Sequence, residues 1–248
     1  MSLSHQKTFF NKEAKTYHKR SFAYFESFKT IKKVANMYIA GKVMDVGNGG
    51  TIGYSLKKVD QITLVDISSE ILKNPKIVVN GKYQKIKNIN YKTIVANVTN
   101  LPFNKNEFDA VVMISTLHHL SESSIKLTKK NMNRAILEIK KVIKPNGYFI
   151  LSECHPNLIL KPIQDLFYII SYPILSIFGK PQPFFLSKKE TTKLLEKHGF
   201  KIVKQSDIPS GAKVYVPLFP SISPPGWFWD KLIESRIYIA KKVLSKRY

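Results

Sequence analysis

A short apolar run that ends in an acid and passes into a glycine-rich turn constrains this chain more than any other feature. Residues 43–50 read VMDVGNGG. The apolar residues around Asp45 favour a strand, and the glycines that follow allow a tight turn whose backbone can approach a ligand closely. We therefore predict a small-molecule site at the carboxyl end of this strand. The dinucleotide-binding fingerprint is absent, because the sixth position of the turn is Ile52 rather than glycine.

The turn resembles the first motif of the class I S-adenosylmethionine-dependent methyltransferases. In that family a hydrophobic run, an acid and a hydrophobic residue precede the pattern G-x-G-x-G. This chain departs from the pattern at Thr51, where the last glycine usually stands, and a chance acid-plus-glycine turn is the alternative. The resemblance implies an S-adenosylmethionine site that includes Asp45, Gly47, Asn48 and Gly49.

A second acid ends the next predicted strand, ITLVD at residues 62–66. Asp66 stands 21 residues after Asp45, close to the ~20 expected between a glycine-rich turn and an acid that binds ribose. A carboxylate there can accept hydrogen bonds from both ribose hydroxyls. The alternative role is a helix cap, because a helical pattern begins at Ser68. We favour the ligand role and place Ile67 beside it in the cofactor site.

The third predicted strand, residues 91–97, leads into VTNLPFNKNEFDAVVM. This stretch resembles the family's segment in which a polar residue meets the adenine ring, followed by L-P-F, F-D and a fourth strand. The resemblance places Asn97 and Val98 at the adenine. The family more often has Asp at the first of these positions, but the carbonyl oxygen of an Asn side chain can still accept a hydrogen bond from the exocyclic amine.

Two histidines follow the fourth predicted strand, residues 110–115. The sequence TLHHL at 116–120 resembles an ending common in the methyltransferase type 11 group. Its position at the carboxyl end of a central strand places Ser115 at the cofactor, and Thr116, His118 and His119 near the cleft. If the acceptor needs a general base, His119 is the first candidate and His118 the second, since histidine titrates near neutral pH. We expect no metal, because no carboxylate or cysteine stands at ligand spacing.

The order of these motifs extends the resemblance over residues 42–242 and implies the fold. We expect an α/β fold with a Rossmann-like, seven-stranded, mostly parallel sheet, helices on both faces and an antiparallel last strand. We further expect a short helix at 51–58, a loop or partly ordered crossing at 73–90, and a helix at 121–144. Strands are expected at 148–153 and 236–242, and between them a helix, a turn at Gly199 and another strand. Glu153 and His155, at the end of the fifth strand, are reserve candidates for the base.

Residues 1–41 are predicted to form a helical lead-in, or cap, ahead of a methyltransferase domain at 42–242. Phe10, Ala14 and Tyr17 form an F-x-x-x-A-x-x-Y arrangement. It resembles the opening helix that several small-molecule methyltransferases fold over their cofactor, which implies that Tyr17 touches cofactor or substrate. Simple packing of an aromatic stripe is the alternative.

Two segments depart from the family pattern and bear on the substrate. Residues 155–185 carry one apolar helical face that we expect to break at Pro173, and residues 214–230 combine prolines with both tryptophans. We expect the two segments to form a lid over a hydrophobic substrate, or a face that lies at a membrane interface. The alternative is that they pack on each other or form a dimer contact. No transmembrane segment is expected, because the longest charge-free run, 166–179, spans 14 residues and a bilayer needs ~18–20.

The net charge of +23, from 40 Lys and Arg against 17 Asp and Glu, implies attraction to something anionic. Nucleic acid, an anionic membrane surface and an acidic carrier protein all qualify. A compositional bias of the genome is the alternative, since the chain is crowded with Lys, Ile and Asn. The single cysteine, Cys154, and a first stretch without an apolar leader favour the cytoplasm, peripheral at a membrane if the charge binds lipid.

We predict an S-adenosylmethionine-dependent methyltransferase for a small acceptor that is lipophilic or carrier-bound, methylated on oxygen or carbon, similar to enzymes of quinone or biotin biosynthesis. An RNA methyltransferase is the alternative that the charge favours. Against it, enzymes that methylate exocyclic base amines carry an N-P-P-Y-like motif where this chain reads ISTLHHL. A non-catalytic binding protein of the same fold is the third hypothesis, for which Thr51 and Asn97 are the only hints.

Overall fold

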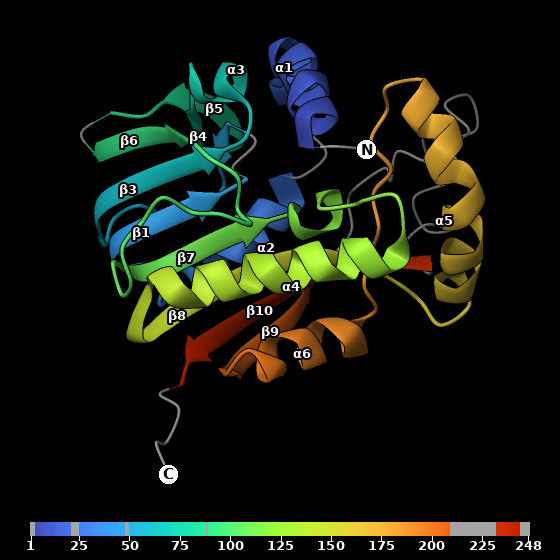
Figure 1. The fold of residues 1–248 in the computed structure, drawn as a ribbon. Helices are drawn as coiled ribbons and strands as arrows, with labels where there is room; N and C mark the ends of the chain where they lie inside the picture. The colour runs from blue at the N-terminus through green and yellow to red at the C-terminus, as the bar shows by residue number, and fades with distance from the viewer. Residues whose placement is uncertain (1–2, 21–24, 48–49, 88, 209–231, 244–248) are drawn as a thin grey trace.

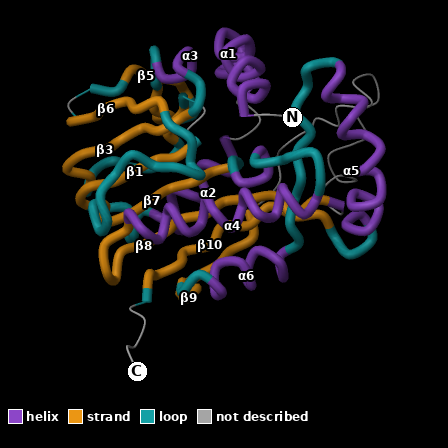
Figure 2. The backbone as a smooth tube through the Cα atoms, in the orientation of Figure 1, coloured by secondary structure: helices purple, strands orange, loops and turns teal. Residues whose placement is uncertain are grey.

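The computed structural model describes residues 3–20, 25–47, 50–87, 89–208 and 232–243. A seven-stranded sheet forms the middle layer, with helices on both faces (Figures 1 and 2). Its strand order is β6-β3-β1-β7-β8-β10-β9. The strands are β1 (Gly41–Val46), β3 (Val59–Asp66), β6 (Asn90–Val95), β7 (Phe108–Ile114), β8 (Ile143–Pro156), β9 (Phe200–Ile208) and β10 (Ile233–Lys242). The predicted fold class is confirmed.

The sheet is parallel except at its last strand in the chain. Strands β6, β3, β1, β7 and β8 pair in parallel, whereas β10 runs antiparallel to both β8 and β9. The chain moves outward from β1 through β3 to β6 and then returns to β7 on the other side of β1. Strand order therefore reverses between β1 and β7, and an open sheet of this kind binds ligands outside the carboxyl ends of the strands at that reversal.

Helices bury both faces of the sheet. They are α1 (Leu3–Arg20), α2 (Phe25–Ala35), α3 (Ser69–Leu72), α4 (Ile125–Val142), α5 (Leu160–Ile177) and α6 (Lys188–Lys197), with a 3-10 turn, η2 (Leu117–His119). In β1, Met44 packs in the core under α4 and α6, while Val43 packs in the core under α2 (Figure 1). Strands covered on both sides need apolar residues at nearly every position, which explains the continuous apolar runs in the sequence.

The segment from 73 to 90, expected to be a loop, contains a hairpin. Strand β4 (Lys76–Val79) pairs antiparallel with β5 (Lys82–Lys85), and the two-residue turn is Asn80–Gly81, both with positive φ. Such a turn matches the right-handed twist of the strands, and Asn-Gly is its most favourable sequence. The loop prediction was wrong because it gave more weight to the polar composition than to this turn signal.

The helix expected at 51–58 is also absent from the described structure. Thr51–Ile52 form the short strand β2, which pairs in parallel with β4. Ile52 and Tyr54 are buried, and the Tyr54 hydroxyl donates to Asp45 Oδ2 at 2.6 Å. Strands β2, β4 and β5 form a second, three-stranded sheet. The segment is a strand despite its weak helical pattern because this pairing buries its apolar side chains.

Pro173 does not break the helix as expected, because α5 continues through it to Ile177. Proline removes one backbone donor, which leaves the carbonyl four residues earlier without its helical partner. That residue, Ile169, lies on the exposed side of α5, where water can satisfy the carbonyl. Predictions for residues 214–230, for Asn48 and Gly49, and for the Tyr17 side chain lie outside the described parts of the chain.

Helix α2 precedes the glycine-rich turn in the sequence and packs into the core of the domain. Phe28, Ile31, Val34 and Ala35 are buried in the cluster that also holds Val43 of β1.

We expect Ile31→Ala to lower the free energy of unfolding by about 3 kcal/mol, because it leaves a cavity at a fully buried position. Lys32→Ala, on the exposed face of the same helix, is the matched control and should change it by less than about 0.5 kcal/mol. Urea unfolding followed by circular dichroism measures both. Equal stability of the two variants would contradict the packing of α2.

Candidate active site

A cleft lies at the carboxyl ends of β1, β3, β6 and β7, at the reversal of strand order and beneath α1. It contains about 620 Å³ of space not filled by atoms, part of it open to solvent. The described lining residues are Gln6, Phe10, Val46, Gly47, Val65, Asp66, Ile67, Ile71, Ala96, Asn97, Val98, Ser115, Thr116, His119 and Leu120. The cleft has the size of a cofactor site, mostly apolar with a few polar groups.

Gly47 begins the turn at the floor of the cleft. Its φ is +67°, a conformation that residues with a side chain rarely adopt, and its N–H donates to Val65 O at 2.7 Å. A Cβ atom here would lie 2.2 Å from Thr116 Cγ2. The Thr116 hydroxyl in turn lies 3.0 Å from Gly47 O. Only glycine lets the turn after β1 and the turn after β7 approach so closely.

Asp66 ends β3 at the side of the cleft. Its Oδ1 accepts a hydrogen bond from Ser68 N at 2.9 Å, which fixes the carboxylate against the first residues of α3. Ser68, not Asp66, caps that helix, because its Oγ accepts from Ile71 N. The cap role that competed with the ligand role is therefore filled by another residue. Ile67 and Ile71 add an apolar surface beside the carboxylate.

Asn97 and Val98 lie on the neighbouring wall, after β6. The side-chain oxygen of Asn97 accepts from Thr99 N at 3.0 Å, and Asn100 N donates to Asn97 O at 2.9 Å. These bonds hold a tight turn at the cleft edge. An amide oxygen has two lone pairs, so the Asn97 side chain keeps one for a ligand.

Glu153 of β8 organises the turn that follows β7. Its Oε1 accepts from Thr116 N at 2.8 Å and from Leu117 N at 2.7 Å, and its Oε2 accepts from His118 Nδ1 at 2.7 Å. The preceding residue, Ser115, has φ +49°, a left-handed conformation that costs a non-glycine residue of order 1 kcal/mol. The carboxylate holds this strained turn in place.

His119 projects from that turn toward the cleft, whereas His118 does not line it. The Phe10 ring meets His119 edge-on at 5.2 Å, and the His118 ring lies 4.1 Å from it. Its Nδ1 atom is enclosed and has no hydrogen-bond partner among the described residues. Burial, and next the neighbouring His118, lower the pKa of His119 well below its usual 6.5, so the ring is neutral at pH 7.

His155, a reserve candidate for the base, is occupied elsewhere. Its Nδ1 donates to Leu186 O at 2.8 Å, and its Nε2 accepts from the Tyr238 hydroxyl at 3.0 Å. Burial lowers the pKa of His155 as well. With both ring nitrogens bonded inside the protein, His155 ties β8 to β10 and to the segment before α6.

Asp45 is buried below the cleft rather than among its lining residues. Burial, and then the Asp45 carboxylate, hold the pKa of the Tyr54 hydroxyl well above its usual value, so Tyr54 stays protonated and donates to Asp45. Asp45 thus supports the turn from beneath.

Helix α1 covers the cleft and contacts both of its walls. Asn11 Oδ1 accepts from Ser68 Oγ at 2.7 Å on one side, and Gln6 Nε2 donates to Ser121 O at 3.1 Å on the other. Phe10 lies between them against His119. The sequence motifs could not locate Gln6 at the cleft, because nothing local marks a contact with a residue 115 positions away.

Six residues predicted for the cofactor site or the base line the cleft together with Gly47: Asp66, Ile67, Asn97, Val98, Ser115 and His119. They converge because each follows the carboxyl end of a parallel strand. Thr116, predicted near the cleft together with the histidines, lines it as well. Ile71 and Leu120 also line it but were not assigned to it from the sequence.

The cleft fits a nucleoside-containing cofactor. A fixed carboxylate stands at the spacing expected for a ribose, apolar side chains flank it for a flat ring, and Gly47 leaves room for close backbone approach. Fold and cleft together define a Rossmann-like methyltransferase domain.

Comparisons with known proteins agree with this class. A model of the methyltransferase domain matches residues 44–151. An uncharacterised protein of Methanocaldococcus jannaschii is 31% identical over 204 residues, which are 82% of this chain and 71% of that protein. A ubiquinone/menaquinone biosynthesis C-methyltransferase of Haemophilus ducreyi is 31% identical over 147 residues, 56% of this chain and 50% of that enzyme. The match therefore spans only half of that enzyme's length.

A solved S-adenosylmethionine-dependent methyltransferase of Methanosarcina mazei superposes with a TM-score of 0.56 at 21% identity, covering 85% of this chain and 97% of that one. This likeness shows the shared fold. The chain belongs to the class I S-adenosylmethionine-dependent methyltransferases, and S-adenosylmethionine is its cofactor. The family that the sequence motifs resemble is confirmed.

We expect Glu153→Ala to lower the free energy of unfolding by about 3–5 kcal/mol, because it leaves the N–H groups of Thr116 and Leu117, and the His118 ring, without their acceptor. Glu153→Gln keeps one oxygen for the two N–H groups and should cost about 1–2 kcal/mol. Glu70→Ala, an exposed carboxylate on α3, is the control and should be nearly neutral. Denaturant unfolding gives the three values, and equal losses for the Ala and Gln variants would contradict the role of Glu153.

Proposed function

We propose that this enzyme transfers a methyl group from S-adenosylmethionine to oxygen or carbon of a small, lipophilic acceptor bound beside His119. The observation that carries the proposal is the enclosed Nδ1 atom of His119, which has no partner among the described residues in a part of the cleft otherwise formed by Phe10 and Leu120. An apolar molecule with one ionisable hydroxyl or acidic C–H complements these groups. The relative that acts in ubiquinone and menaquinone biosynthesis supports this class of acceptor.

The cleft has two parts, one for the cofactor and one, beside His119, for the acceptor. Asp66 would hold the ribose of the cofactor, Ile67 and Val98 would flank its adenine, and Asn97 would accept from the exocyclic amine. Gly47 would let the backbone approach, with Asp45 beneath it, and Asn48, Gly49, Ser115 and Tyr17 stay predicted contacts. S-adenosylmethionine supplies an already activated methyl group. The protein's task is thus to align the acceptor and exclude water.

His119 is suited to take a proton from the acceptor. Its ring is neutral at pH 7, because burial lowers its pKa, so a nitrogen lone pair is available. The rings of Phe10 and His118 both pack against it, at 5.2 and 4.1 Å between ring centroids. His118 is the weaker candidate, since its Nδ1 is engaged by Glu153 and its ring stacks on Phe185 at 4.7 Å.

We expect Asp66→Asn to weaken binding of S-adenosylhomocysteine about 10- to 100-fold, since charge-assisted hydrogen bonds contribute about 1.5–3 kcal/mol. Glu70→Gln makes the same chemical change on the exposed side of α3 and should leave the affinity unchanged. Isothermal titration calorimetry measures both. An unchanged Kd for Asp66→Asn would remove the carboxylate from the cofactor site.

The acceptor class is tested with methyl-labelled S-adenosylmethionine and fractions of a cell extract. We expect label in the lipid-soluble fraction with the wild-type enzyme, and about 10²- to 10⁴-fold less with His119→Asn, the usual contribution of a general base. His198→Asn is the control, because His198 bonds to Asn133 on α4, away from the cleft. Label confined to the RNA fraction would contradict the proposal.

The pH profile tests the base separately. The pKa of His119 lies below 6.5, so the fraction of neutral ring is already near its maximum at pH 6.5. For the wild-type enzyme kcat/KM should therefore stay level from pH 8 to 6.5 and fall only under more acidic conditions. A profile that falls with a midpoint at or above 6.5 would assign the base to another group.

A further inference from the structure

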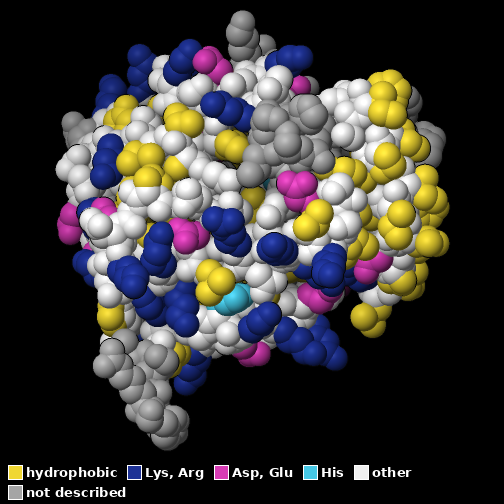
Figure 3. All heavy atoms as spheres, in the orientation of Figure 1, with side chains coloured by type: hydrophobic (Ala, Val, Ile, Leu, Met, Phe, Trp, Pro, Cys, Tyr) yellow, Lys and Arg dark blue, Asp and Glu magenta, His cyan; other side chains and the backbone are white. Residues whose placement is uncertain are grey.

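Helix α5 and the residues beside it carry an exposed apolar face, the α5 outer face. Its members are Leu158, Ile159, Ile163, Leu166, Phe167, Ile170, Ile174, Ile177 and Phe178, each between 45% and 92% exposed. Figure 3 shows the yellow side chains gathered over α5, at the right edge of the molecule. Scattered apolar residues are normal on a soluble protein, but a continuous face of this kind marks an interaction surface.

The spacing along the helix makes this face one stripe. Positions 159, 163, 166, 170, 174 and 177 repeat at intervals of three and four residues, so their side chains line one side of a helix with 3.6 residues per turn. The buried residues of α5, Tyr168, Ser171, Tyr172 and Leu175, lie on the opposite side. The helix is therefore apolar on the side that faces away from the protein.

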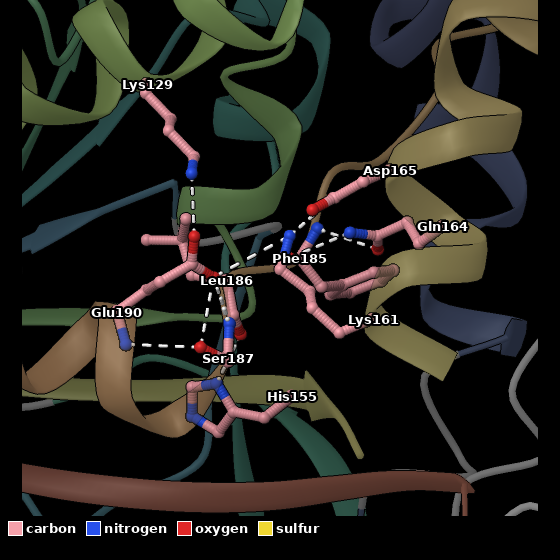
Figure 4. A network of polar contacts seen from close by, with 9 residues as sticks. All are labelled: Lys129, His155, Lys161, Gln164, Asp165, Phe185, Leu186, Ser187 and Glu190. Carbon is pink, nitrogen blue, oxygen red and sulfur yellow. Dashed lines mark hydrogen bonds and ion pairs between the residues drawn. The ribbon is translucent and has the colours of Figure 1, made fainter. Parts of the chain in front are cut away.

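The inner side of α5 is fixed by polar bonds. Tyr168 donates to Glu122 O at 2.7 Å, and Gln164 exchanges two hydrogen bonds with the backbone of Phe185, at 2.9 and 3.1 Å. Lys161 pairs with Asp165 on the same helix and lies 3.6 Å from Glu190 (Figure 4). Rolling the helix to hide its outer face would break these bonds, so the exposure is built into the structure.

Charge selects among the possible occupants of this face. The chain carries a net charge of +23, and a second copy would carry the same charge, so close association of two copies meets strong repulsion. An anionic bilayer surface attracts the same charge, and each basic residue near it contributes about 1 kcal/mol. Figure 3 shows Lys and Arg side chains over much of the visible face. No described helix is long and apolar enough to cross a bilayer.

We propose that the α5 outer face docks on an anionic membrane surface, with the helix lying in the interface plane. A single convex helix with aliphatic and aromatic side chains on one side suits the boundary between headgroups and acyl chains. The polar bonds on the inner side keep the helix attached to the domain. Helix α5 follows β8 at the same edge of the sheet as the cleft, so docking brings the cleft toward the membrane (Figure 1).

The test is sedimentation of the full chain with vesicles of phosphatidylcholine alone, or of phosphatidylcholine with phosphatidylglycerol. We expect at least about tenfold stronger partitioning onto the anionic vesicles, reduced by salt. Leu166→Ser/Ile170→Ser keeps the charge and removes two exposed side chains, and it should weaken partitioning by about tenfold or more. Leu127→Ser/Leu137→Ser, two exposed leucines of α4, is the matched control and should bind like wild type.

Three further readouts decide the occupant. Light scattering gives the mass in solution, and a dimer that Leu166→Ser/Ile170→Ser dissociates would overturn the proposal in favour of a second copy. Urea unfolding without vesicles should be nearly unchanged in this variant; a large loss of stability would show that the protein itself buries these side chains, and it would overturn the proposal. Absence of partitioning, or equal partitioning onto neutral vesicles, would also overturn it. Binding of S-adenosylhomocysteine should be unchanged in every variant, which separates this proposal from the methyl-transfer chemistry.

Discussion

The site depends on one buried carboxylate. Glu153, on β8, accepts hydrogen bonds from two consecutive backbone N–H groups after β7 and from His118. The first N–H groups of a helical turn have no partner within the turn, so an external acceptor decides its position. Here that acceptor comes from the neighbouring strand, and it places Thr116 against Gly47 O and His119 at the cleft. The glycine turn and the histidine turn are therefore parts of one arrangement.

The two N-terminal helices are held in different ways. Helix α2 buries four side chains in the core, including Phe28 and Ile31. Helix α1 is fastened over the cleft by side-chain bonds such as Gln6 to Ser121 and Asn11 to Ser68, and each bond of this kind contributes only about 0.5–1.5 kcal/mol. Local opening requires less free energy where fewer apolar contacts are lost. Among the side chains that the structure describes, those of α1 bury less apolar surface than those of α2, so we expect α1 to open more readily than α2.

The sequence predicted the fold class and much of the cleft because both depend on local patterns. Gly47, Asp66, Asn97 and His119 each follow a strand, and parallel strands bring their carboxyl ends to one edge. The hairpin at Asn80–Gly81 could also have been predicted from its Asn-Gly turn, although we expected a loop there. The contacts of Gln6 with Ser121 and of Glu153 with the turn after β7 join residues far apart in the chain. No local pattern carries that information, so these contacts could not be predicted.

Hydrogen bonds between distant parts of the chain also help to keep the apolar side of α5 outward. A helix that only minimised exposed apolar area would turn its aliphatic side chains toward the protein. In α5 the inner positions hold Tyr168 and Gln164, whose polar ends satisfy backbone groups at Glu122 and Phe185. Turning them outward would leave those groups without the partners they have now, a cost of about 1–3 kcal/mol for each one that stays buried. The orientation of α5 is thus held by these hydrogen bonds together with the burial of Tyr168, Tyr172 and Leu175, and its outer face stays available to a partner that is itself apolar.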